Sequence, residues 1–161
     1  MPFASVGIAT WSDSEDSWEL LEPLVTADGV NNELERPHLF VHDDFYYLFF
    51  STQARMFHAE VTAPTGLYGF VASNLLGPYE PLNGHGLVFA DPPERPFPAH
   101  SCTVLNDLGV VGFIDAVGID GATGTNLFAD PAGRRRGEFG GTLAPKVRLT
   151  IRGSQAAVAS L

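Results

Sequence analysis

The sequence has little cysteine, few basic side chains and no long apolar run. Its single cysteine, Cys102, excludes an internal disulfide and cannot form a zinc site alone, so we expect it to pack as a small apolar side chain. Nine basic residues against 19 acidic ones give a formal net charge of -10. The lack of a basic stripe argues against a nucleic-acid partner, and the lack of a membrane-length apolar run argues against a membrane partner.

Glycine and proline, by contrast, are abundant and indicate the fold class. The 17 glycines and 12 prolines recur between short apolar or aromatic runs, which is typical of an all-β protein with many tight connections. The pattern predicts strands at residues 39–41, 45–51, 67–73, 86–89, 101–105, 110–114 and 143–151. The segment His42-Asp43-Asp44-Phe45 predicts a hairpin turn, because aspartate tolerates positive φ. At 161 residues, the chain can bury one core, which indicates one domain or a piece of one.

Three further segments have less regular patterns. Residues 12–21 are a helix candidate, because serine and aspartate could cap an acidic first turn. Residues 45–50 are apolar in both alternating sets of side chains, so we expect a strand that is buried on both faces. Residues 118–141 predict a long irregular surface loop, in which three consecutive arginines, at 134–136, are most simply solvated.

The segment Glu33-Leu34-Glu35-Arg36-Pro37-His38, which precedes the aromatic strand, carries most of the functional information. Two carboxylates beside an arginine, at the mouth of aromatic strands, are what acid-assisted cleavage of a sugar bond needs. In a strand, residues two apart face the same side, so Glu33 and Glu35 could both point into one pocket. Taken alone, the same pattern is more commonly a surface ion pair between Glu35 and Arg36 at a strand entrance.

Several blocks along the chain carry a resemblance to a known family. They are VGIA (6–9), WELLEPL (18–24), GVNN (29–32), ERPH (35–38), GLYGFV (66–71), LGPYEPLNG (76–84), FID (113–115) and GGTLAP (140–145). In this order they resemble glycoside hydrolase family 68, the levansucrases, inulosucrases and related bacterial fructosyltransferases that act on sucrose. The resemblance runs over residues 6–153 and indicates part of such an enzyme.

The resemblance implies a five-bladed β-propeller with the sucrose pocket at its axis, of which this chain supplies the C-terminal blades. The sequence alone is equally compatible with a β-sandwich. The resemblance also favours a strand over a helix at residues 18–21. Family 68 enzymes are usually exported, which implies an extracellular location, whereas residues 1–7 lack the basic start and apolar core of a signal peptide. Either the export signal belongs to a missing N-terminal part, or this product stays inside the cell.

By resemblance, Glu35 is the general acid/base that protonates the glucosyl oxygen and then deprotonates the incoming water or sugar hydroxyl. Glu33 and Gln53 stand where family members contact substrate, and Arg36 is expected to join this set by holding Glu35 in place. Gln53 replaces the usual arginine or histidine and supplies no charge, which favours hydrolysis or transfer to small acceptors over fructan elongation. The alternative for Gln53 is an ordinary polar residue at a strand end.

We expect neither a nucleophile nor a metal site in this chain. In the family, the nucleophilic aspartate lies in a Trp-Asp strand and a second aspartate lies in an Arg-Asp-Pro motif. Neither context occurs here, so these roles are not given to Asp13 or Asp130. Asn32 stands where many members have an aspartate that helps to bind a structural calcium in Gram-positive enzymes, and the loss of that charge weakens such a site. No cofactor is expected, and the expected partners are sucrose and sugar acceptors.

Three interpretations of the chain remain. It is the C-terminal segment of a family 68 fructosyltransferase, a non-catalytic remnant that binds sugar or a partner, or a piece that pairs with a separately encoded N-terminal segment. We favour the first. Without a nucleophile, a retaining transfer loses its covalent step, so we expect negligible sucrose turnover by the chain alone.

Overall fold

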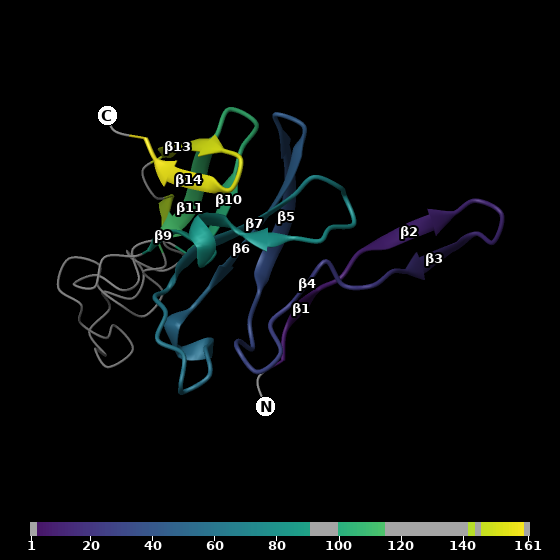
Figure 1. Cartoon of the computed structure of the whole chain (residues 1–161), viewed down its shortest axis with the longest axis horizontal. Helices are drawn as coiled ribbons and strands as arrows, with labels where there is room; N and C mark the ends of the chain where they lie inside the picture. The colour runs from purple at the N-terminus through teal and green to yellow at the C-terminus, as the bar shows by residue number, and fades with distance from the viewer. Residues whose placement is uncertain (1–2, 91–99, 115–141, 144–145, 160–161) are drawn as a thin grey trace, which may run out of the picture.

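The computed structural model describes residues 3–90, 100–114, 142–143 and 146–159, and in these ranges the chain consists almost entirely of strands and their connections. Two larger antiparallel sheets form the body of the protein, and the β2–β3 hairpin projects away from them (Figure 1). No helix in the described ranges is long and apolar enough to cross a membrane. The predicted all-β fold is confirmed, while the predicted loop at residues 118–141 lies outside the described residues.

The first sheet contains β5 (Glu35–His42), β6 (Phe45–Thr52), β7 (Gly66–Ala72), β8 (Glu80–Pro81) and β9 (Leu87–Ala90). β5 is an edge strand, β6 lies between β5 and β7, and β7 pairs with both β8 and β9. Asp43 and Asp44 form the β5–β6 turn with φ of 48° and 63°. Positive φ at both central residues matches the right-handed twist of the flanking strands. This confirms the hairpin turn that the two aspartates predicted.

The second sheet contains β10 (His100–Val104), β11 (Gly109–Ile114), β12 (Thr142–Leu143), β13 (Val147–Arg152) and β14 (Gln155–Val158). The prediction of one strand at residues 143–151 is wrong, because β12 and β13 pair with opposite ends of β11. The sequence between them contains Pro145, which has no N–H to donate to a strand ladder. Residues 144–145 lie outside the described part of the chain.

Two small antiparallel sheets come first in the chain: β1 (Ser5–Val6) pairs with β4 (Val25–Thr26), and β2 (Ala9–Ser12) pairs with β3 (Ser17–Leu20). The helix candidate at residues 12–21 is therefore wrong, and the strand that the family resemblance favoured there is confirmed. Trp11 and Trp18 face each other across the hairpin, with ring centroids 5.4 Å apart in an edge-to-face arrangement. Such cross-strand aromatic pairs stabilise a hairpin over the alternative helix.

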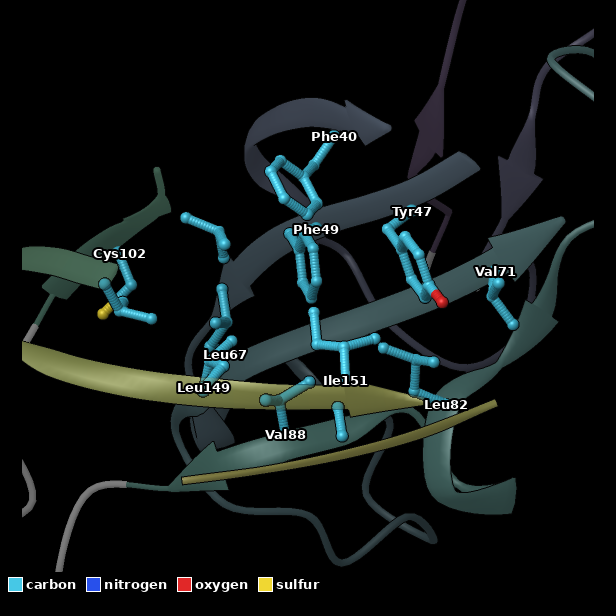
Figure 2. Packing of buried hydrophobic residues seen from close by; sticks show 13 residues of the cluster. Phe40, Tyr47, Phe49, Leu67, Val71, Leu82, Val88, Cys102, Leu149 and Ile151 are labelled. Carbon is cyan, nitrogen blue, oxygen red and sulfur yellow. The ribbon is translucent and has the colours of Figure 1, made fainter. Parts of the chain in front are cut away.

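The core consists of two apolar clusters on opposite faces of β6. Tyr47 and Phe49 point into the larger cluster, where Leu149 and Ile151 of β13 pack against them (Figure 2). Leu48 and Phe50 belong to the smaller cluster, whose other buried members are Val6 and Tyr68. The predicted burial of this strand on both faces is confirmed. Buried Cys102 lies in the larger cluster, as the sequence predicted.

The side chain of Asn83 connects the first sheet to the last strand. Asn83 lies in the 3-10 turn η2 (Leu82–Gly84), which precedes β9. Its Nδ2 donates to the Ala156 carbonyl at 2.9 Å, and its Oδ1 accepts the Ala156 N–H, also at 2.9 Å. This amide therefore satisfies both backbone groups of one residue of β14, in the way that a neighbouring strand would.

The Gly66→Ala substitution is expected to destabilise the protein by about 1–3 kcal/mol, because it overpacks the β7–β9 junction. A Cβ at this position would clash with the Phe89 carbonyl oxygen and would lie 3.0 Å from the Ala90 Cα, both of which are backbone atoms that cannot rotate away. The matched control is Gly7→Ala, since no atom lies within 4 Å of the Cβ there. Urea unfolding of both variants measures the effect, and equal midpoints for the two would contradict it.

Candidate functional site

The candidate site lies at the open end of the β5–β6 hairpin, away from the Asp43–Asp44 turn. Glu35 is the first residue of β5, and its Cα partner in β6 is Ser51. Gln53 follows β6 directly, and Glu33 lies two residues before β5. The side chains of Glu33, Glu35 and Gln53 are all partly exposed, so each remains within reach of solvent.

Glu33 is hydrogen-bonded to the backbone of Gln53. The Gln53 N–H donates to Glu33 Oε1 at 3.2 Å, which joins the segment before β5 to the segment after β6. The structure thus brings together two of the residues that the sequence singled out. The expectation that Glu33 and Glu35 are alternate residues of one strand is wrong, because Glu33 precedes β5 and the strand begins at Glu35. The alternation argument therefore does not apply to this pair.

Arg36 occupies a β-bulge immediately after Glu35. The β5–β6 register shifts between Glu35 and His38, and Arg36 has a φ of 51°. Pro37 fits this position because an edge strand at a bulge tolerates a residue without an N–H. The Arg36 side chain is exposed and makes no ion pair with Glu35 within the described part of the chain. The surface ion pair considered from the sequence is therefore not observed, and Arg36 is connected to its surroundings through its backbone.

His38 accepts a hydrogen bond at one ring nitrogen and donates one from the other. The Val104 N–H of β10 donates to His38 Nε2 at 3.0 Å. Because a backbone N–H can only donate, Nε2 carries no proton, and the ring proton lies on Nδ1. His38 Nδ1 therefore donates to the Arg36 carbonyl at 3.2 Å. Burial lowers the pKa of His38, with the bond to Arg36 opposing that shift.

The buried side-chain amide of Asn31 connects the segment around Glu33 to the end of β6. Asn31 Oδ1 accepts the Glu33 N–H at 2.7 Å, and Asn31 Nδ2 donates to Thr52 Oγ1 at 2.9 Å. Both Asn31 and Thr52 are 2% exposed, so these polar groups have no water to replace a lost partner. Asn31 thereby fixes the backbone of Glu33 against the end of β6, one residue before Gln53.

Arg55 places a positive charge beside Gln53. Its Nε donates to Gln53 Oε1 at 3.0 Å. The sequence pattern indicated only the neutral amide at position 53, and the guanidinium two residues further on was not predicted. The Gln53 amide oxygen is therefore already polarised by a cation.

Asn32 lies next to this network and is exposed. Its Oδ1 accepts the N–H of Phe3 at 3.1 Å. Among the described residues, no group of three or more histidine, cysteine, aspartate or glutamate side chains lies close enough to hold a metal ion.

Comparison with known proteins decides the family. The family model described as Levansucrase/Invertase, of glycoside hydrolase family 68, matches residues 2–161. The chain belongs to this family. The levansucrase of Rahnella aquatilis is 40% identical to it over 154 residues, which cover 95% of this chain and 34% of the relative. The levansucrase of Zymomonas mobilis is 39% identical over 157 residues, again with 34% of its own length covered.

Solved structures of an inulosucrase and a levansucrase are also similar to this chain. An inulosucrase from Halalkalicoccus jeotgali bound to kestose has a TM-score of 0.78 and 38% identity, covering 96% of this chain and 39% of that one. A levansucrase from Gluconacetobacter diazotrophicus has a TM-score of 0.77 and 32% identity over 96% of this chain and 32% of its own. The chain thus spans about a third of the length of the curated relatives it matches. Its all-β fold is part of the family's β-propeller, as the resemblance predicted.

The protein is expected to lose stability on acidification partly through His38. Because burial lowers the pKa of His38, the unfolded chain takes up a proton near the ordinary value of 6.5 while the folded ring stays neutral. The contribution of this group is therefore fully present above pH 6.5 and is lost as the pH falls toward the folded pKa. Urea midpoints between about pH 5 and about pH 7.5 should fall less in His38→Gln than in the wild type. If the urea midpoints of the two proteins fell by the same amount over this pH range, the contribution of His38 would be refuted.

Proposed function

We propose that this chain supplies the acid/base portion of a sucrose-cleaving fructosyltransferase of the levansucrase type. The observation that carries the proposal is the position of Glu35 at the open end of the β5–β6 hairpin, beside the hydrogen-bonded Glu33 and Gln53, in a chain 40% identical to levansucrases. A carboxyl group that remains within reach of solvent at a strand end can exchange a proton with a bound sugar.

In the proposed reaction, Glu35 gives its proton to the glucosyl oxygen as the bond to the fructosyl group breaks. The same carboxylate then takes a proton from the incoming water or sugar hydroxyl, which attacks the fructosyl group. Gln53, polarised by Arg55, and Glu33 contact sugar hydroxyls, while Arg36 supports Glu35 through the bulge. The covalent step needs a second carboxylate as nucleophile. We propose that this nucleophile is supplied by a part of the enzyme outside this chain.

The purified 161-residue chain is therefore expected to release no glucose or fructose from sucrose above the level of Glu35→Gln. Without a nucleophile, the acid alone cannot form the fructosyl intermediate. Enzymatic glucose and fructose assays at several protein concentrations make the measurement. Release proportional to wild-type protein and lost in Glu35→Gln would show that a nucleophile is present in the chain. Sucrose or fructan binding without cleavage by a folded monomer would instead favour the non-catalytic sugar-binding alternative.

A further inference from the structure

Two backbone N–H groups of β10 are bonded by side chains of the first sheet. Among the described strands, β10 is the first of its sheet and pairs with β11 alone. On its other side, the Cys102 N–H donates to Ser51 Oγ at 3.1 Å and the Val104 N–H donates to His38 Nε2 at 3.0 Å. Cys102 and Val104 are two residues apart, so their N–H groups point the same way. Side chains thus take the place of a neighbouring strand at this junction of the sheets.

Both acceptors are connected to the candidate acid through the β5–β6 ladder. Ser51 is the Cα partner of Glu35 across the β5–β6 ladder and is 6% exposed. His38 closes the bulge that begins after Glu35, through its bond to the Arg36 carbonyl. The two sheets are therefore bonded to each other through the ladder partner of Glu35, which is Ser51, and through His38 at the end of its bulge.

His38 is well suited to this task because its ring contacts three parts of the structure. One nitrogen bonds to Arg36 in the bulge, the other bonds to Val104 in the second sheet, and the ring stacks on Phe49 with centroids 5.7 Å apart. A left-handed conformation at a non-glycine residue is strained and persists only where its surroundings impose it. The hydrogen bond from His38 to the Arg36 carbonyl is such a constraint.

We propose that His38 and Ser51 are positioning residues that clamp the two sheets together and fix the orientation of Glu35. The importance of Glu35 itself rests on the proposed function, whereas the clamp is a property of the folded chain. The clamp needs an acceptor on both side chains and a donor on His38. Glutamine at position 38 keeps a donor and an acceptor, whereas phenylalanine keeps the aromatic stacking and loses both hydrogen bonds.

The test uses NMR spectroscopy of the full chain and its His38→Gln and His38→Phe variants, without any sugar. In His38→Phe, we expect the Val104 amide to exchange roughly tenfold faster, because a buried N–H without an acceptor destabilises the closed state that protects it from exchange. We also expect the side-chain carboxyl ¹³C resonance of Glu35 to move at constant pH. His38→Gln is expected to restore both signals toward the wild type.

A purely structural role would change the exchange of Val104 and leave the Glu35 carboxyl resonance at its wild-type position, and that result would overturn the proposal. If His38→Phe does not fold, Ser51→Ala tests the other half of the clamp. It should speed the exchange of the Cys102 amide and also move the Glu35 resonance, and an unmoved resonance again overturns the proposal. None of these readouts needs sucrose turnover, so they stay informative if the proposed function fails.

Discussion

Glu35→Gln is expected to lower sucrose cleavage by about 10²–10⁴-fold in an enzyme in which this chain replaces the matching third of the Rahnella levansucrase. The two proteins are 40% identical over 154 residues, which defines the segment of the relative to be exchanged. Glutamine has the shape of glutamate but cannot give a proton to the leaving oxygen or accept one from the acceptor. Initial rates of glucose release at saturating sucrose make the measurement.

The matched control for this experiment is Glu80→Gln. Glu80 is an exposed carboxylate of β8 that pairs with Val71, near the end of β7 remote from Gly66 and the site. Its removal changes the net charge by the same amount and should leave the rate within about twofold, which is the effect of an ordinary surface substitution. A comparable loss in both variants would refute the acid/base role of Glu35. A wild-type hybrid that releases no glucose would argue against the proposed function of the chain.

Phe49→Ala is expected to destabilise the protein by about 3–5 kcal/mol, a large part of the 5–15 kcal/mol typical of a domain. Phe49 is fully buried in the larger cluster beside Tyr47 (Figure 2). Its ring also stacks on the His38 ring, with centroids 5.7 Å apart. The ring also covers Gly69, where an added Cβ would lie 2.7 Å from Phe49 Cε1, and a glycine has no side chain with which to fill the cavity that the truncation leaves. Urea unfolding followed by fluorescence measures the loss.

Val41→Ala is the control for the core substitution. Val41 belongs to β5, the strand next to β6, but its side chain is 62% exposed. A surface truncation of this kind usually changes stability by about 0.5 kcal/mol or less. If the two substitutions shift the urea midpoint equally, the two-faced burial of β6 is not what holds the sheets together.

The sequence predicted those parts of the fold that depend on local pattern. Glycine and proline mark the ends of most strands, the aromatic run specifies β6, and Asp43-Asp44 specifies its turn. Prediction from the sequence failed where local signals compete. Serine and aspartate at residues 12–16 have helix-capping chemistry, yet the Trp11–Trp18 contact across the hairpin prevails. It also failed at residues 143–151, where the alternating apolar residues Val147, Leu149 and Ile151 belong to β13 alone and Leu143 belongs to the separate strand β12.

The candidate site was predicted only as a set of positions. Resemblance located Glu35, Glu33, Arg36 and Gln53, but not the contacts among them. The bond between His38 and Val104 joins residues 66 positions apart, and the bond between Asn31 and Thr52 joins residues 21 apart. Neither pair has a spacing that a helix or strand pattern would reveal, because both depend on how the strands come together. The sequence does show an asparagine, Asn31, just before the acidic segment. That this asparagine is buried, and therefore structural, is visible only in the fold.

The Asn83 side chain has a consequence for how the protein behaves at high concentration. Strand β14 ends the second sheet in the described structure, and an exposed strand edge is a template on which another chain can add a strand. At Ala156, however, both backbone groups on that edge are already bonded to Asn83. A chain approaching from outside finds no donor or acceptor there with which to start a ladder. The amide of one asparagine thus makes the backbone of Ala156 unavailable for strand addition at this edge.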